Sequence, residues 1–266
     1  MYDYHIHSNF STDSNMTMDQ ACRQSIELGL KEIAFTDHLD IDYPNFDDQF
    51  MIDFSLYTEQ YNTVRAKYAP RLKVIKGIEI GLQPHTLRQS LEVASSYQFD
   101  YIIASTHVVD KLDLHNGDFC RGKAKEQAYR RYLEDMYDCI KLFPMFNVLG
   151  HIDLIRRYGN YDDKSMKYGD YADILDIILK WLIENGKGIE INTSGFRYNL
   201  NSTMPTPEFV RRYKELGGEI LTIGSDAHST DYIAYKFDLA YDISREAGFK
   251  YVTTFEQQQP SFKKIY

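Results

Sequence analysis

Short apolar runs alternate with amphipathic stretches along the whole chain, and this alternation predicts seven strands and seven helices. The strands are expected over Tyr2–His7, Glu32–His38, Lys73–Gly81, Tyr101–Val108, Asn147–Asp153, Gly188–Thr193 and Glu219–His228. The helices are expected over Thr17–Leu28, Ser55–Ala69, Leu87–Tyr97, Lys123–Leu142, Tyr171–Glu184, Thr206–Leu216 and Asp231–Ala247. Residues typical of helix ends support these bounds, since Gly29, Pro70 and Asn185-Gly186 follow three helices and Thr206-Pro207 resembles an N-cap followed by proline.

Repeated β–α alternation implies parallel strands that are joined by helical crossovers. A closed or nearly closed α/β barrel of about seven strands satisfies this pattern, and a doubly wound open sheet is the alternative. No Pro/Gly/Ser-rich linker or repeat interrupts the chain, so we expect a single domain over residues 1–266. The loops Leu39–Phe54 and Val109–Gly122 exceed the usual connection length and are expected to frame a site. The tail from Tyr251 could add a short strand.

The composition, 43% hydrophobic and 26% charged, is typical of a globular protein. A net charge of -9 argues against a polynucleotide partner, which would need a broad basic surface. No apolar run approaches the ~20 residues of a membrane span, so no membrane partner is expected. Three cysteines without CxxC spacing and a start, MYDYHIH, unlike a signal peptide together predict a cytoplasmic protein. The pattern leaves the oligomeric state open.

Histidines and acids recur at the C-terminal ends of the predicted strands. They are His5, His7, His38, Glu79, His107, His151, Asp226 and His228. In a parallel barrel these ends meet at one rim, where active sites are built. A single strand-end histidine is usually a hydrogen-bonding residue, but so many at matching ends predict a metal site.

Imidazole and carboxylate ligands without cysteine suit Zn, Mn or Fe. The candidates exceed what one ion can use, so two or three divalent metals are expected, with a carboxylate such as Glu79 bridging. Such a cluster generates hydroxide near neutral pH and holds the attacking and leaving oxygens. Hydrolysis, most naturally of a phosphoester, is the predicted chemistry.

The motifs that contain these residues resemble those of a known family. HxH at 5–7 with Asp13 eight residues after the first histidine, TDH at 36–38, GIE at 77–79, STH at 105–107, GHID at 150–153 and SDAH at 225–228 resemble, in order, the PHP (polymerase and histidinol phosphatase) superfamily. The family fold is a distorted (β/α)7 barrel. Within the superfamily, GHIDLIRRYG, EINTSGFRYN and AYRRYLE resemble the stand-alone histidinol-phosphate phosphatases of the HisK type.

The resemblance implies three metal sites. One would use His5, His7, Glu79 and Asp226; the second, Glu79, His107 and His151; the third, Asp13, His38 and His228. Many relatives have histidine at the position of Asp13, and this departure affects the occupancy or identity of the third metal.

The resemblance also implies a phosphate-binding role for Arg157, or its neighbour Arg156, and for Arg197, since a guanidinium fork suits two phosphate oxygens. Next to the ligands, Asp37, Asp153 and Asn192 are expected either to orient them or to cap strand ends through backbone hydrogen bonds. The acidic loop residues are either solvated or meet a cationic group of the substrate, for which Asp42 and Asp48 are the candidates among Asp40, Asp42, Asp47 and Asp48.

The function that the resemblance implies is metal-dependent hydrolysis of a small phosphate monoester, L-histidinol phosphate, to L-histidinol and phosphate in histidine biosynthesis. A metal-bridging hydroxide would attack phosphorus in line. A PHP phosphoesterase acting on nucleotides, oligonucleotides or phosphotyrosine is one alternative, and a catalytically silent metal-binding regulatory module is another. The acidic net charge does not exclude a phosphate, because three divalent ions carry six positive charges against the three negative charges of Asp13, Glu79 and Asp226.

Overall fold

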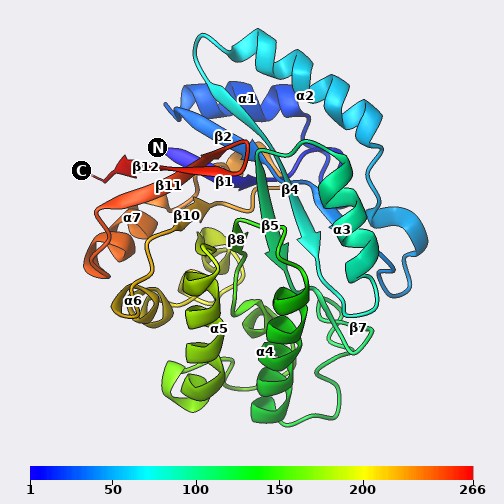
Figure 1. Ribbon diagram of the computed structural model, residues 1–266, viewed down its shortest axis with the longest axis vertical. Coiled ribbons are helices and arrows are strands. Elements are labelled where there is room, and N and C mark those ends of the chain that lie inside the picture. Colours follow the sequence, from blue (N-terminus) through cyan, green and yellow to red (C-terminus); the bar gives the residue numbers. More distant parts are fainter. Residues whose placement is uncertain (266) are drawn as a thin grey trace.

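Seven parallel strands form a nearly closed barrel at the centre of the protein (Figure 1). The computed structural model describes residues 1–265, apart from the side chains of residues 47 and 48. In spatial order the strands are β1 (Tyr2–Ile6), β2 (Glu32–Phe35), β4 (Lys73–Gly81), β5 (Tyr101–Ser105), β8 (Val148–Leu149), β9 (Gly188–Asn192) and β10 (Leu221–Gly224). The backbone N–H of His7 donates to the carbonyl of Ala227 at 2.9 Å and that of Asp226 to the carbonyl of His5 at 2.7 Å. These bonds join the end of β1 to the segment after β10, so the expected (β/α)7 barrel is confirmed.

Seven α-helices surround the strands, as the alternation predicts (Figure 1). They are α1 (Met18–Glu27), α2 (Phe54–Tyr68), α3 (Leu87–Ser96), α4 (Lys125–Leu142), α5 (Ala172–Glu184), α6 (Pro207–Glu215) and α7 (Phe237–Glu246). Thr17 caps α1 in a capping box with Gln20, and Pro207 opens α6 after Thr206. No helix among residues 1–265 is both long and apolar enough to span a membrane.

Four predicted strands are much shorter than expected. The seventh is only Leu221–Gly224, and in the other three the chain changes partner or direction near the site. The second strand stops at Phe35 and resumes as β3 (His38–Asp40), which pairs with β4 alone. The fourth ends at Ser105 and is followed by a small antiparallel pair, β6 (Val108–Val109) and β7 (Leu112–Asp113). The fifth is only two residues long, since the chain turns into the 3₁₀ helix η2 (Leu154–Arg157).

The last predicted helix also begins later than expected. The 3₁₀ helix η5 (Thr230–Tyr232) comes first, and Ala234 and Lys236 have left-handed φ values of 55° and 57°. A helix cannot run through such residues, so α7 starts at Phe237. The remaining 3₁₀ helices are η1 (Asp47–Phe50), η3 (Tyr168–Tyr171) and η4 (Thr193–Phe196).

The C-terminal tail closes one end of the barrel. It forms a two-stranded antiparallel hairpin, β11 (Tyr251–Glu256) and β12 (Gln259–Lys264), instead of a single added strand. Phe255 on β11 stacks on Tyr101 with ring centroids 5.2 Å apart, and its backbone N–H donates to the hydroxyl of Tyr4 at 2.8 Å. These aromatic side chains form a buried cluster in the barrel interior, next to the hairpin.

A register shift in β1 places consecutive residues in the barrel. The pairing of β1 with β2 is irregular between Asp3 and Ile6. Tyr4 belongs to the interior cluster, whereas Ile6 packs in the core between strands and helices. Because a bulge resets the alternation of side chains, His5 and His7 also face the interior, above Tyr4.

Candidate metal and phosphate site

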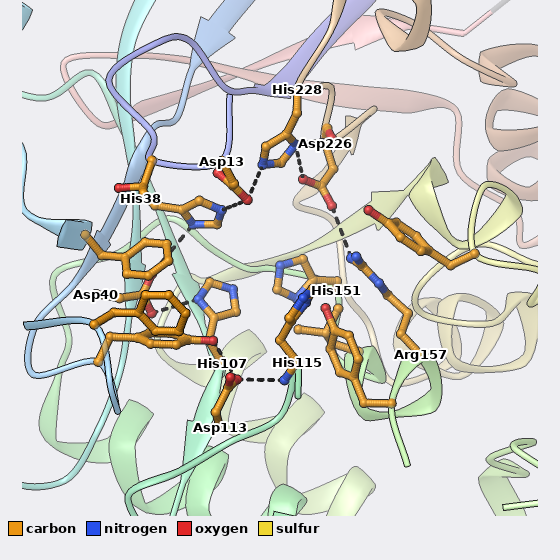
Figure 2. A pocket seen from close by; sticks show the side chains of 17 residues that line it. Asp13, His38, Asp40, His107, Asp113, His115, His151, Arg157, Asp226 and His228 are labelled. Atoms are coloured by element: carbon orange, nitrogen blue, oxygen red, sulfur yellow. Dashed lines mark hydrogen bonds and ion pairs between the residues drawn. The ribbon is translucent and has the colours of Figure 1, made fainter. Parts of the chain in front are cut away.

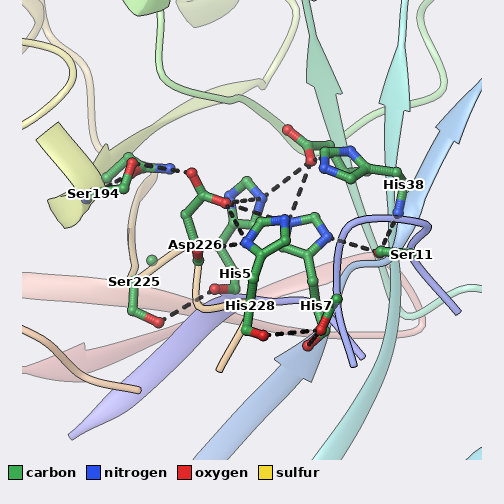
Figure 3. Close-up of polar contacts among 12 residues, drawn as sticks. His5, His7, Ser11, His38, Ser194, Ser225, Asp226 and His228 are labelled. Carbon is green, nitrogen blue, oxygen red and sulfur yellow. Dashed lines mark hydrogen bonds and ion pairs between the residues drawn. The ribbon is translucent and has the colours of Figure 1, made fainter. Parts of the chain in front are cut away.

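The side chains expected to bind metal converge at the C-terminal end of the barrel (Figures 2 and 3). Donor atoms lie within 4.8 Å of one another in three overlapping groups, which are His5, His7 and Glu79; His7, His38 and His228; and His38, Glu79 and His107. The other predicted ligands adjoin these groups through ion pairs made by Asp13, His151 and Asp226. The structure therefore brings all nine side chains together.

Glu79, near the end of β4, lies at the centre of the cluster and is fully buried. Its carboxylate oxygens lie within 3.6 Å of one nitrogen from each of His5, His7, His38, His107 and His151. Burial opposes ionisation of this carboxyl group, but the surrounding histidines hold its pKa well below the usual range. The pairing of β3 with β4 sets His38 directly beside Glu79 and thereby contributes to this position.

Asp226 and Asp13 bring carboxylates to the other side of the cluster. Oδ1 of Asp226 lies 3.4 Å from Nε2 of His7, and Oδ2 of Asp13 lies 3.1 Å from Nε2 of His228. Asp226 has a left-handed backbone with φ of 55°, which is strained for a residue other than glycine. Although burial opposes the charge on both acids, the nearby histidines lower the pKa of each.

Several atoms at the centre are buried and have no hydrogen-bond partner among the described residues. They are Nε2 of His5, His7 and His228, Nδ1 of His38 and Oε2 of Glu79. An unpaired polar atom in the interior costs about 1 to 3 kcal/mol, so a group of them facing one another is unfavourable unless another group binds there. Metal ions fit this requirement, because imidazole nitrogens and carboxylate oxygens are their ligands.

Two carboxylates that the motifs did not single out orient the histidines. Nδ1 of His5 lies 2.6 Å from Glu190 on β9, and Nδ1 of His107 lies 2.8 Å from Asp40 on β3. Because an ionised carboxylate only accepts hydrogen bonds, Nδ1 carries the proton and Nε2 keeps its lone pair for a metal. Of the two alternatives expected for Asp40, the solvated one is wrong, since this residue is only 3% exposed and its carboxylate is hydrogen-bonded to His107.

Glycines beside these carboxylates are the sequence signal that could have revealed them. A side chain at Gly81 would collide with the carboxylate of Asp40, and one at Gly224 would collide with that of Glu190. Both glycines follow apolar strand residues, where a larger side chain would otherwise stabilise the strand.

Asp37 orients His7 through Ser11. The Ser11 hydroxyl donates to Asp37 at 2.8 Å and accepts the backbone N–H of His38 at 3.0 Å. Nδ1 of His7 lies 3.0 Å from the same hydroxyl oxygen, which has already used its only proton (Figure 3). His7 must therefore donate from Nδ1, and its Nε2 faces the cluster. These contacts match the first of the two roles expected for Asp37.

Asn192 and Asp153 differ in their contacts. The amide of Asn192 donates to Glu190 at 3.2 Å, one contact from His5, and its Oδ1 accepts the backbone N–H of Ser194 at 2.9 Å, so its contacts match both expected roles. Asp153 instead accepts hydrogen bonds from Arg156 at 2.7 Å and from the backbone N–H of Thr206 at 3.2 Å. These contacts correspond to the backbone-capping interpretation of Asp153, and they also direct Arg156 away from the cluster.

The two other arginines both contact Asp226. Arg157 approaches Oδ2 of Asp226 at 3.8 Å (Figure 2). Its guanidinium group lies over the ring of Tyr198. Both terminal nitrogens of Arg197 donate, at 2.7 Å each, to the carbonyls of Ser225 and Asp226. Arg157 lines the cavity above the cluster, and Arg197 is not among the lining residues that the structure describes.

A cavity of about 470 Å³ opens above the cluster. Both predicted loops border it, through Tyr43, Phe46 and Phe50 from the first loop and Asp113 and His115 from the second. The carboxylate of Asp42 is exposed and lies 2.6 Å from Nε2 of His85. Asp42 is not among the described residues that line the cavity, where a group that binds the substrate is expected. The side chain of Asp48 lies outside the described residues.

Comparisons with known proteins agree with this arrangement. The family model of the PHP domain matches residues 3–194. A histidinol-phosphatase of Lactococcus lactis is 33% identical over 254 residues, which are 95% of this chain and 93% of that protein. A probable histidinol-phosphatase of Clostridium acetobutylicum is 33% identical over 255 residues, 94% of this chain and 95% of that protein. The crystal structure of a Lactococcus lactis histidinol phosphate phosphatase with zinc, L-histidinol and phosphate superposes with a TM-score of 0.92 at 32% identity, covering 98% of both chains.

Proposed function

This chain belongs to the PHP domain family, and we propose that it hydrolyses L-histidinol phosphate to L-histidinol and phosphate in histidine biosynthesis. The observation that carries the proposal is the set of unpaired imidazole nitrogens around Glu79, beneath a cavity that Arg157 lines. The similarity to relatives named histidinol-phosphatase over nearly the whole chain supports the choice of substrate. We propose that residues 1–266 act as one domain.

The cluster would hold two to three divalent metals, chosen from Zn, Mn and Fe. The proposed ligand sets are His5, His7, Glu79 and Asp226; Glu79, His107 and His151; and Asp13, His38 and His228. When bound, divalent metals lower the pKa of water and stabilise negative charge on phosphate oxygens.

The residues of the chain orient the substrate and the ligands. Arg157 would bind the phosphate, because its guanidinium group lines the cavity beside Asp226. Arg197 remains a second proposed phosphate ligand, because its bonds to the two carbonyls use only two of its five N–H donors. Glu190, Asp40 and Ser11 would keep the Nδ1 protons of three histidines in place, so that their Nε2 atoms stay available.

The experiment that tests this proposal couples elemental analysis of the purified protein to steady-state rates on four substrates. L-histidinol phosphate is expected to give the highest kcat/KM, above AMP, a phosphotyrosine peptide and a short oligonucleotide. Comparable or greater efficiency on any of the last three would overturn the choice of substrate. Metal without phosphate release from any of them would instead indicate a silent metal-binding module.

A further inference from the structure

The second long loop places a buried carboxylate in the wall of the cavity. Asp113, on β7, is 1% exposed and lines the cavity. It belongs to none of the three groups of metal-donor atoms. Figure 2 shows it away from Arg157 and Asp226, below the histidine cluster.

Asp113 differs from the other carboxylates that line this cavity. Those of Asp13, Asp40 and Asp226 each lie within ion-pair distance of a histidine. Among the described residues, Asp113 has no lysine, arginine or imidazole partner within that distance. A buried carboxylate without a cationic partner is costly, unless a ligand supplies the positive charge.

Neutral hydrogen bonds hold Asp113 in place and leave part of it available. The hydroxyl of Tyr43 donates to Oδ1 at 2.6 Å, and the backbone N–H of His115 donates to the same oxygen at 2.7 Å. Both of these bonds end on Oδ1, so Oδ2 can accept from a ligand in the cavity. The contact with Tyr43 also joins the two loops that border the site.

The wall next to Asp113 is aromatic. Tyr43 packs against Phe50 with ring centroids 4.6 Å apart, and Phe46 lies 5.8 Å from each of them. Aromatic faces attract cations and flat rings. The cavity therefore has Arg157 in one part of its wall and a carboxylate with aromatic rings in another, where Phe50 also lies 6.3 Å from the ring of His38 in the cluster.

We propose that Asp113 binds the cationic nitrogen of the alcohol part of the substrate and thereby selects phosphomonoesters that are positively charged at the other end. This inference rests on the proposed function, because L-histidinol carries an ammonium group and a titratable imidazole. Asp113 then takes the role that the sequence pattern suggested for Asp42 and Asp48.

The first measurement is the binding of L-histidinol and of inorganic phosphate to the metal-loaded protein by calorimetry. Asp113→Asn keeps the hydrogen-bond acceptor for Tyr43 and removes only the charge. We expect it to weaken L-histidinol binding about ten- to hundredfold and to change phosphate binding less than twofold. Asp118→Asn, in the same loop but paired with the exposed Arg121, is the control and should change neither.

The second measurement compares KM for L-histidinol phosphate with KM for phenyl phosphate, whose alcohol part is uncharged. Asp113→Asn should raise the first about tenfold or more and leave the second, and kcat for both, within threefold. Tyr43→Phe keeps the carboxylate of Asp113. It should therefore change KM for either substrate by less than Asp113→Asn changes KM for L-histidinol phosphate.

The outcomes separate this inference from the proposed function. If wild-type protein does not prefer L-histidinol phosphate to phenyl phosphate, the proposed function fails. If the preference exists and Asp113→Asn leaves it intact, or raises both KM values equally, only the role of Asp113 is wrong. If KM for L-histidinol phosphate rises selectively in Asp42→Asn and not in Asp113→Asn, the cation-binding role belongs to the first loop and the role of Asp113 is wrong.

Discussion

At the scale of single residues, the second nitrogen of each histidine determines what the cluster can bind. His5 and His107 each contact a carboxylate through Nδ1, and His228 contacts the backbone carbonyl of Asp226 at 3.0 Å. Acceptors that cannot donate fix the proton on Nδ1 and turn the Nε2 lone pair toward a shared centre. The geometry of the site therefore depends on Glu190 and Asp40 as well as on the ligands.

Replacing Glu79 tests the centre of the cluster. Glu79→Ala removes a carboxylate that faces five histidines, so the metals it would bridge would lose a shared ligand and its negative charge. We expect the metal content to fall and kcat on L-histidinol phosphate to drop about a thousandfold or more. Elemental analysis and steady-state kinetics measure both, with the exposed Glu92→Ala on α3 as the control. Near-normal turnover with a full metal count would contradict the assignment.

Replacing Glu190 tests the orientation of His5 without removing a ligand. The amide of Glu190→Gln can donate an N–H to Nδ1 of His5 as well as accept from it, so the proton of His5 is no longer fixed on Nδ1. In part of the population the proton is then on Nε2, which loses its lone pair for the metal. The affinity of the protein for Zn²⁺ in a chelator competition should fall about ten- to hundredfold. Glu184→Gln, exposed on α5, should leave the affinity unchanged. An unaltered affinity in Glu190→Gln would show that packing alone orients His5.

At the scale of elements, the strand ends and the loops after them carry the site. β3 and β7 are short strands inside the two long loops, and they supply Asp40 and Asp113. Pairing of β3 with β4 keeps Asp40 beside Gly81, so the loop is as well ordered there as a strand. Long loops with such internal pairing can hold a carboxylate at a defined position.

The helix α4 contains a buried acid whose protonation affects stability. Burial raises the pKa of Asp135 from 3.8 to about 6, although Arg131 acts in the opposite direction. The folded state therefore binds more protons than the unfolded state between about pH 4 and 6. Its stability relative to an uncharged variant falls across this window as pH rises, by about 3 kcal/mol at most.

Asp135→Asn should remove this dependence. We compare the free energy of unfolding of the variant with that of wild type at each pH. The difference, variant minus wild type, should be about 1 to 3 kcal/mol larger at pH 7.5 than at pH 4.5. Urea unfolding of both proteins at both pH values measures the difference, and titration of the metal cluster cancels because it is common to both. The same difference at both pH values would contradict the shifted pKa.

At the scale of the whole molecule, the net charge of -9 and the phosphate substrate are reconciled by where the charges lie. Asp13, Glu79 and Asp226 are among the acids that face histidines in the cluster. Metal ions bound there would make the site positive, while the remaining residues keep a negative net charge. Such a site would attract a small anion into the cavity.

Removing metal tests the link between the cluster and the stability of the barrel. Ligands come from both ends of the strand order, so bound metal ties β1 to the segment after β10. With free metal ~1,000-fold above its Kd, binding contributes about 4 kcal/mol, and a chelator should lower Tm by about 10 °C. Differential scanning calorimetry with and without chelator measures the shift. The chelator should lower the Tm of Glu79→Ala by less than that of wild type. An equal Tm for wild-type protein with and without chelator would contradict the proposal.

Hydrophobic periodicity left a barrel and a doubly wound open sheet as alternatives, and the resemblance to the PHP superfamily implied the barrel. The sequence by itself determined the order of strands and helices and the gathering of His5, His7, Glu79 and the other strand-end residues at one rim. These features follow from local hydrophobic periodicity and from the rule that parallel strands end at the same side. It also predicted that two long loops border the site.

Only the tertiary structure decided which side chains face one another across strands that are distant in sequence. Glu190 meets His5 across 185 residues, and Asp113 meets Tyr43 across 70, because barrel closure and loop packing bring them together. The hairpin β11–β12 and the register shift in β1 are of the same kind. Their physical cause is a contact between elements, which periodicity along one segment does not encode.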